Sequence, residues 1–282
     1  MKVMKKALAI LLAMGMAASL AACGGSSSSA PTEDKKAEET TDAAAAGDTG
    51  AAQGTAQFDK ITFGTNAEFP PFEFVSSTGG VIGEFDGIDM AIAKEICDNL
   101  GAEPVINNIE FDSLLIALQN GQIDAVIAGM TVTEERKQSV DFTTPYYTAT
   151  QVMIVKEDSD IQKATDMADK KIAVIQGYTG EICVKDLGYS YDSFKKGTDA
   201  ILELMNGKAD VVVIDSATAQ KYVTDNPGLK IVEDNEQFAS EEYAIAVKKG
   251  NTELLNALNA EIDKLLKANR VAELGDQYSV AE

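Results

Sequence analysis

A segment that ends at Arg136 carries residues suited to binding a carboxylate. A short apolar stretch, Ile123–Ala128, reads as a strand that breaks at Gly129 and restarts as a helix. The open N-terminus of a helix has unpaired backbone N–H groups and partial positive charge, so anions bind there readily. Thr131 or Thr133 can cap this helix, and the planar guanidinium of Arg136 matches the two oxygens of a carboxylate. From these residues alone, an ordinary strand-to-helix turn with a surface arginine is an equally good interpretation.

A second part of the chain repeats the pattern that leads into this segment. Residues 118–129 read Leu-Gln-Asn-Gly-Gln-Ile-Asp-Ala-Val-Ile-Ala-Gly, and residues 204–215 read Leu-Met-Asn-Gly-Lys-Ala-Asp-Val-Val-Val-Ile-Asp. Because ligands of open α/β sheets bind beyond the carboxyl ends of parallel strands, we expect Gly129 and Asp215 to face one cleft. Donors for an anion at one end and a carboxylate for a cation at the other suit a zwitterion. The alternative is that Asp215 only caps the helix that begins at Ser216.

The elements that position these residues alternate between strand and helix from Phe58 onward. This alternation is typical of α/β proteins. Proline residues in the loop 66–73 exclude regular structure there. The predicted strands are Ile61–Thr65, Ile123–Ala128, Val152–Val155, Lys171–Ile175 and Val211–Ile214, and the predicted helices are Ile88–Leu100 (ended by Gly101), Leu114–Leu118, Asp199–Asn206, Ser216–Thr224 and Thr252–Asn269.

The first residues indicate export. Three lysines precede an apolar run from Ala7 to Ala22, which is the layout of a secretory signal rather than of a membrane span. Leu20-Ala21-Ala22-Cys23-Gly24 resembles a bacterial lipobox, which implies cleavage before Cys23 and a diacylglyceryl group on its sulfur; an incidental cysteine after a plain signal peptide is the alternative. Two acyl chains anchor a protein stably. We therefore predict a signal peptide over 1–22, and a lipidated Cys23 with a disordered linker over 23–57, which has no aromatic, Val, Ile or Leu residue.

Composition excludes several classes of function. The chain has 45 acidic and 24 basic residues and a net charge of −21, which argues against nucleic acid as a partner. It contains no histidine, so imidazole bases, Ser-His-Asp triads and most zinc sites are ruled out. We expect no metal and no cofactor. Cys97 and Cys183 lie in apolar helical patterns and are expected to be buried free thiols.

Several motifs resemble the solute-binding proteins of polar amino-acid ABC importers. The resemblance begins at about Ile61 and continues in order to the C-terminus. The motifs are Gly64-Thr65-Asn66, Phe69-Pro70-Pro71-Phe72-Glu73-Phe74, Ile88-Asp89-Met90, Phe111-Asp112, Gly129-Met130-Thr131-Val132-Thr133-Glu134-Glu135-Arg136, Val140-Asp141-Phe142 and Pro145-Tyr146-Tyr147. The resemblance implies a two-lobed α/β fold of the periplasmic-binding-protein type (type II), with the ligand in the interlobe cleft. Lobe I would comprise residues 58–147 and 243–282, lobe II residues 151–239, and the hinges residues 148–150 and 240–242.

The resemblance also implies a set of ligand contacts. The charged ends of an L-amino acid would be held by Thr131, Arg136 and Thr179 at the α-carboxylate and by Ala128, Gly129 and Asp215 at the α-ammonium.

For the ligand side chain, the resemblance places Phe69 and Phe111 on either side of its aliphatic part. Asn66 stands where many relatives have an aspartate, which weakens the case for lysine or arginine as ligand because a neutral amide does not balance a buried cation. Tyr178 stands where a small hydroxyl residue is common in relatives, and it would narrow the pocket or donate its phenol. Glu68 is expected to be a solvated loop charge, although it could approach a basic ligand.

The expected function is that of the substrate-binding component of an ABC importer. Such a protein, here a monomer anchored outside the membrane, captures a polar L-amino acid and delivers it to the permease. A basic amino acid such as arginine is the alternative ligand. Two other functions stay open at this point, a dehydratase-like enzyme on the same scaffold and an extracellular amino-acid sensor module; the expected activity is binding without catalysis.

Overall fold

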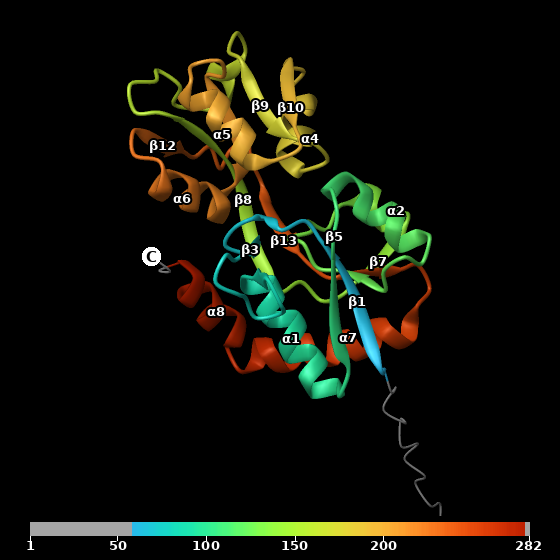
Figure 1. Ribbon diagram of the computed structural model, residues 1–282. Coiled ribbons are helices and arrows are strands. Elements are labelled where there is room, and N and C mark those ends of the chain that lie inside the picture. Colours follow the sequence, from blue (N-terminus) through green and yellow to red (C-terminus); the bar gives the residue numbers. More distant parts are fainter. Residues whose placement is uncertain (1–57, 280–282) are drawn as a thin grey trace, which may run out of the picture. The chain divides into compact units, whose positions relative to one another are not determined.

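Two β-sheets with flanking helices organise residues 58–279, the part of the chain that the computed structural model describes (Figure 1). The first sheet has the strand order β5-β1-β6-β14-β7, and the second has the order β10-β9-β11-β8-β12, with β13 paired to β8. A mixed α/β fold with two sheets agrees with the prediction. The predicted signal peptide, Cys23 and the linker lie outside the described residues.

The first lobe is the five-stranded sheet with the elements packed on it. Strand β1 pairs in parallel with β5 and β6, whereas β14 pairs antiparallel with β6 and β7. Its strands are β1 (Lys60–Thr65), β5 (Glu103–Asn108), β6 (Ala125–Val126), β7 (Val140–Phe142) and β14 (Ala246–Lys248), and a small ribbon adds β2 (Glu68–Phe69), β3 (Glu73–Val75) and β4 (Phe85–Asp86). Its helices are α1 (Ile88–Leu100), η1 (Phe111–Ser113), α2 (Leu114–Gln119), α3 (Glu134–Lys137), α7 (Thr252–Lys267) and α8 (Arg270–Ser279).

The second lobe is built on the six-stranded sheet. Parallel pairs join β9 to β10 and β11, and β8 pairs antiparallel with β11 and β12. Its strands are β8 (Tyr147–Lys156), β9 (Ile172–Ile175), β10 (Tyr191–Phe194), β11 (Val211–Asp215), β12 (Leu229–Val232) and β13 (Ser240–Tyr243), and its helices are η2 (Ala164–Met167), α4 (Thr179–Asp186), α5 (Gly197–Met205) and α6 (Ser216–Asp225). Among the helices within residues 58–279, none is long and apolar enough to cross a membrane.

Helix α1 shows how local pattern fixes an element. Ile88, Ile92 and Ile96 recur at helical spacing and are all buried. Gly101 adopts φ 70°, a left-handed conformation that glycine adopts without a side-chain clash, and its N–H bonds the carbonyl of Asp98. The predicted helix Ile88–Leu100 is therefore confirmed.

Several element predictions differ from the structure. The loop 66–73, expected to have no regular structure, contains β2 and the first residue of β3, because Glu68 and Phe69 pair with Phe74 and Glu73 on either side of the prolines. The strand expected over Ile123–Ala128 is shorter, because only Ala125 and Val126 pair with β1 and β14. The final helix expected to run to Asn269 ends at Lys267, and a second helix, α8, begins at Arg270. Asn269 has a positive φ of 59°, which turns the chain between them.

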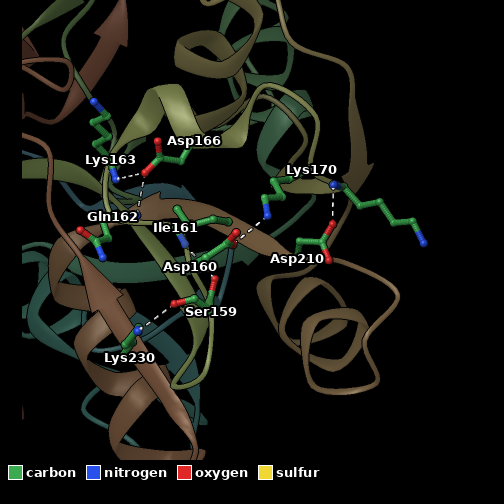
Figure 2. Close-up of polar contacts among 10 residues, drawn as sticks. Ser159, Asp160, Ile161, Gln162, Lys163, Asp166, Lys170, Asp210 and Lys230 are labelled. Atoms are coloured by element: carbon green, nitrogen blue, oxygen red, sulfur yellow. Dashed lines mark hydrogen bonds and ion pairs between the residues drawn. The ribbon is translucent and has the colours of Figure 1, made fainter.

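The repeated pattern seen in the sequence has the same structural role in both lobes. In the first lobe the N–H of Thr62 bonds the Asp124 carboxylate, while the N–H of Asp124 bonds the Thr62 carbonyl, both at 2.8 Å. Asp210 makes the same pair of bonds with the backbone of Lys171, again at 2.8 Å, and Figure 2 shows Asp210 with the bond to its carboxylate. Each acid thus fixes the turn after the Asn-Gly pair to the start of the neighbouring strand.

The lobes are connected through paired strands. Strand β8 belongs to the second sheet, and it also pairs antiparallel with β13, which leads into β14 of the first sheet (Figure 1). In this pairing Thr148 lies opposite Glu242, Ala149 opposite Glu241 and Thr150 opposite Ser240. The two segments expected to be hinges therefore lie side by side.

The two cysteines within residues 58–279 are free thiols. Cys97 is buried in α1, and burial raises its pKa to about 12. Cys183 in α4 is only half-buried, so the prediction of burial is wrong for this residue. The short helix α4 turns one side of Cys183 toward a surface groove that it shares with Thr131 and Ser240.

Candidate functional site

Arg136 supplies positive charge to a buried site between the lobes. Its Nη1 donates to the carbonyl of Thr131 at 2.7 Å, and its Nη2 donates across to the carbonyl of Gly177 in the second lobe at 2.9 Å. Its guanidinium carbon lies 5.4 Å from the ring centroid of Phe111, a cation–π distance. Burial lowers the pKa of Arg136 from its ordinary value, and the carboxylates of Glu241 and Asp215 oppose this shift.

The helix that carries Arg136 is short. Helix α3 has four residues, and the Oγ1 of Thr133 accepts the N–H of Arg136 at 3.1 Å. Of the two threonines considered as caps, Thr133 is therefore the one that caps this helix. Because so few peptide units are aligned in α3, the guanidinium, more than the helix terminus, provides the positive charge.

Asp215 supplies the opposite charge from the end of β11. It is buried, and the Tyr243 hydroxyl donates to its Oδ1 at 2.5 Å. Burial and the nearby Glu241 carboxylate raise the pKa of Asp215 to about 7. Although Asp215 occupies the N-cap position of α6, its side chain makes no capping bond. Helix capping therefore does not explain why an acid stands here.

The predicted contact residues converge on one small cavity. It is lined by Phe69, Phe111, Ala128, Gly129, Thr131, Arg136, Tyr178, Thr179 and Asp215, which includes every predicted contact except Asn66. Its volume is only about 10 Å³, room for one water molecule. An amino acid therefore fits only after the walls of this cavity move apart.

Aromatic rings form one wall of the cavity, and Asn66 lies behind them. Tyr178 packs edge-on against Phe69 at 5.3 Å and Phe111 at 4.5 Å between ring centroids. The Tyr178 hydroxyl donates to Asn66 Oδ1 at 3.3 Å, and Asn66 Nδ2 donates to the carbonyl of Ile109. The phenol of Tyr178 thus stands between the cavity and the amide of Asn66.

Glu68 is engaged by a lysine of the other lobe. Lys196 Nζ donates to Glu68 Oε1 at 2.6 Å. Glu68 stays partly exposed, as expected, but it lies in β2 and has a partner. Its carboxylate is neutralised by an ion pair beside the cleft.

Glu241 is a site residue that the sequence prediction missed. Its Oε2 accepts the hydroxyl of Thr131 at 2.9 Å and that of Thr179 at 2.7 Å, so one carboxylate oxygen joins both lobes. The amide Nε2 of Gln151 donates to the same oxygen at 3.4 Å. Glu241 lies in a polar run, Ser240–Tyr243, that carries no motif, so no sequence signal marks it.

A pair of buried acids supports the site from inside the first lobe. Asp89 accepts the N–H of Gly129 at 2.8 Å and the Tyr146 hydroxyl at 2.9 Å, and burial raises its pKa to about 6. Glu73 is fully buried, and within the described residues neither of its carboxylate oxygens has a hydrogen-bond partner. Burial and the charge of Asp89 raise the pKa of Glu73 well above its ordinary value. Glu73 and Asp89 each stand between apolar residues in the sequence, and this was the sequence signal that could have marked them as buried acids.

Comparison with known families identifies relatives over most of the chain. The family model described as "Bacterial extracellular solute-binding proteins, family 3" matches residues 61–281. "ABC transporter arginine-binding protein 1" of Escherichia coli (strain K12) is 32% identical over 233 residues, which cover 80% of this chain and 93% of that protein. "Probable histidine-binding protein" of Neisseria gonorrhoeae is 36% identical over 225 residues, which cover 77% of this chain and 82% of that protein.

Solved structures of amino-acid-binding proteins are also similar to this chain. "An ancestral arginine-binding protein bound to glutamine" superposes with a TM-score of 0.73 at 39% identity, covering 79% of this chain and 99% of that one. A likeness of this extent covers both sheets and the strands that connect them.

Proposed function

The chain belongs to family 3 of the bacterial extracellular solute-binding proteins, and from this premise we propose that it captures a polar L-amino acid and delivers it to the permease of an ABC importer. The observation that carries the proposal is the pair Arg136 and Asp215. Buried charges of opposite sign line one cavity and come from different lobes. A zwitterion is the ligand whose charges complement both.

Each end of the amino acid has a defined set of partners in this proposal. The Arg136 guanidinium and the hydroxyls of Thr131 and Thr179 would receive the α-carboxylate. Asp215 and the backbone carbonyls of Ala128 and Gly129 would receive the α-ammonium. Closure of the lobes around the ligand excludes water, which strengthens each charge pair.

The surroundings of the side-chain end favour a neutral polar amino acid such as glutamine. Asn66 offers an amide and Tyr178 a phenol, both able to bond a neutral polar group. Glu68, which could balance a cation, is already paired with Lys196. A buried cationic side chain would lack a free carboxylate here, which is costly.

A basic amino acid such as arginine is the second candidate ligand. The names of relatives favour it, since these relatives include an arginine-binding protein and a probable histidine-binding protein. Two carboxylates, those of Asp215 and Glu241, also act on the guanidinium of Arg136. For arginine to bind, Glu68 would have to exchange Lys196 for the ligand.

Thermal-shift screening of the full chain against the twenty L-amino acids tests the function. A ligand that binds only the folded state at a hundred times its Kd stabilises that state by about 2.7 kcal/mol. We expect glutamine or another neutral polar amino acid to raise the Tm most. Stabilisation by arginine alone would overturn the neutral-ligand assignment, and stabilisation by none of the twenty would overturn the proposed function.

The proposal includes the mode of attachment and the absence of catalysis. A diacylglyceryl group on Cys23 would hold the protein to the outer face of the membrane, and Cys23→Ser should then release it from the membrane fraction. As a pure binder the protein should return its ligand unchanged. Time-resolved NMR of a mixture with excess amino acid would reveal product if the enzymatic alternative held.

A further inference from the structure

Glu241 lies where the two lobes and both connecting strands meet. It projects from β13, and its Oε2 accepts hydrogen bonds from Thr131 in the first lobe and Thr179 in the second. Gln151, on the partner strand β8, donates to the same oxygen and also donates to Thr179 Oγ1 at 3.0 Å. The carboxylate thus gathers a set of donors that converge on a single point.

These donors are the ones proposed to receive the ligand carboxylate. A hydroxyl has one proton and donates one hydrogen bond at a time. The hydroxyls of Thr131 and Thr179 therefore cannot serve Glu241 and a ligand carboxylate together.

We propose that Glu241 is an internal competitor of the ligand, a carboxylate of the chain that occupies the hydroxyl donors until the amino acid's carboxylate displaces it. The ligand half of this inference rests on the proposed function. The bridge itself rests on the hydrogen bonds of Glu241 alone. While Glu241 accepts both hydroxyls, it links the two lobes. Once the ligand displaces it, the ligand carboxylate links them instead.

The surroundings of Glu241 leave room for the displaced carboxylate. The residue is half-buried and borders a surface groove of about 520 Å³ whose walls include Val132, Thr148, Cys183 and Ser240. A turn of the side chain into this groove would return its charge to water. Displacement also removes a negative charge from beside Asp215, which leaves that residue better able to ionise and pair with the α-ammonium.

Calorimetry with L-glutamine and L-arginine as probes tests the competition. Glu241→Ala removes the competing side chain, and Glu241→Gln removes only its charge. Each variant should bind the probe that the parent binds, with a Kd about tenfold lower than that of the parent. Glu242→Ala is the matched control, because Glu242 is the next residue on β13, carries the same charge and is exposed. Its affinity should stay within about twofold of the parent. Unchanged or weaker binding by both Glu241 variants would overturn the inference. Glu241 would then be a structural residue that does not compete with the ligand.

A second measurement needs no ligand. In the ligand-free protein, hydrogen exchange of the backbone amides around Thr131 and at the start of α4 should be faster in Glu241→Ala than in the parent and in Glu242→Ala. Equal exchange in all of them would show that Glu241 does not hold the lobes. If neither probe binds the parent, the proposed function fails while this exchange comparison still decides whether the bridge exists.

Discussion

Arg136 and Asp215 are both buried, and neighbouring groups stabilise the charge of each to a different extent. Each terminal nitrogen of Arg136 donates one hydrogen bond to a backbone carbonyl, which leaves its charge without a counter-charge. Asp215 has the Tyr243 hydroxyl but also a neighbouring carboxylate, and its pKa rises to about 7. Each group would gain a counter-charge from a bound amino acid, which is why both are placed in the ligand site.

Truncating either charge should nearly abolish binding. In Arg136→Ala or Asp215→Ala, one charged end of a buried ligand loses its partner, which costs about 3–5 kcal/mol. We expect the Kd for the bound amino acid to rise a hundredfold or more, since about 1.4 kcal/mol corresponds to tenfold. Lys137→Ala, which removes an exposed charge next to Arg136, is the control for calorimetry. Either site variant binding within about threefold of the parent would contradict the assignment.

Affinity should depend on pH through Asp215. Only the ionised carboxylate pairs with an ammonium, and in the ligand-free protein Asp215 is largely protonated below its pKa of about 7. Binding lowers this pKa, so affinity should increase as pH rises from about 5 to 7 and level off above, with proton release on the acid side. Calorimetry in buffers of different ionisation enthalpy measures that release.

The Asp215→Asn variant is the control for this pH dependence. It should bind weakly and lose the pH dependence, although Glu241 and Tyr243 remain beside the position. A Kd that is constant for the parent between about pH 5 and 8 would rule out this role for Asp215.

At the scale of elements, the turn after β6 is the most constrained part of the site. Gly129 has a φ of 52°, and its N–H is held by Asp89. A Cβ at this position would lie 2.6 Å from Cε1 of Phe69. The turn therefore needs glycine for both its conformation and its contact with the aromatic wall.

Gly129→Ala should destabilise the protein more than a glycine substitution without a clash. Gly101→Ala is the matched control, since Gly101 also has a positive φ of 70°, but a Cβ there would meet no other atom within 4 Å. Overpacking typically lowers the free energy of unfolding by about 1–3 kcal/mol. Urea denaturation should show this additional loss of unfolding free energy for Gly129→Ala. Equal losses for the two variants would mean that the Phe69 ring can move aside without destabilising the protein.

At the scale of the whole described unit, polar contacts cross between the lobes around the cavity. They join Arg136 to Gly177, Tyr178 to Asn66 and Lys196 to Glu68, in addition to the bridge at Glu241. With a cavity of about 10 Å³, these contacts must open before an amino acid enters. Binding and lobe movement are therefore coupled, as in hinge closure around ligands.

The Glu68–Lys196 pair links lobe closure to ligand choice. Both side chains are partly exposed, at 29% and 47%, so the pair contributes at most about 1 kcal/mol. Lys196→Ala should change the affinity for glutamine less than about fivefold. It should raise the affinity for arginine relative to glutamine, because Glu68 becomes free to pair with a cation. Parallel titrations with both amino acids measure this ratio. Lys195→Ala is the control, because it removes a neighbouring lysine that pairs with Asp112 of the first lobe at 3.7 Å and leaves the partner of Glu68 in place.

Local sequence patterns were enough to predict several elements and the charged ends of the candidate site. Apolar spacing and Gly101 specify α1, and the repeated Asn-Gly pattern placed Gly129 in the turn after β6 and Asp215 at the end of β11. These features follow from periodicity, turn residues and parallel pairing, which act over a few residues or one supersecondary unit.

Contacts between distant side chains became visible only in the folded molecule. The fold placed Asn66 behind Tyr178, paired Glu68 with Lys196 and brought Glu241 onto the hydroxyls of Thr131 and Thr179. The physical reason is that such contacts depend on the pairing of β8 with β13 and on the packing of one lobe against the other. Residues separated by more than a hundred positions leave no local signal of these contacts, as the 110-residue separation of Thr131 and Glu241 illustrates.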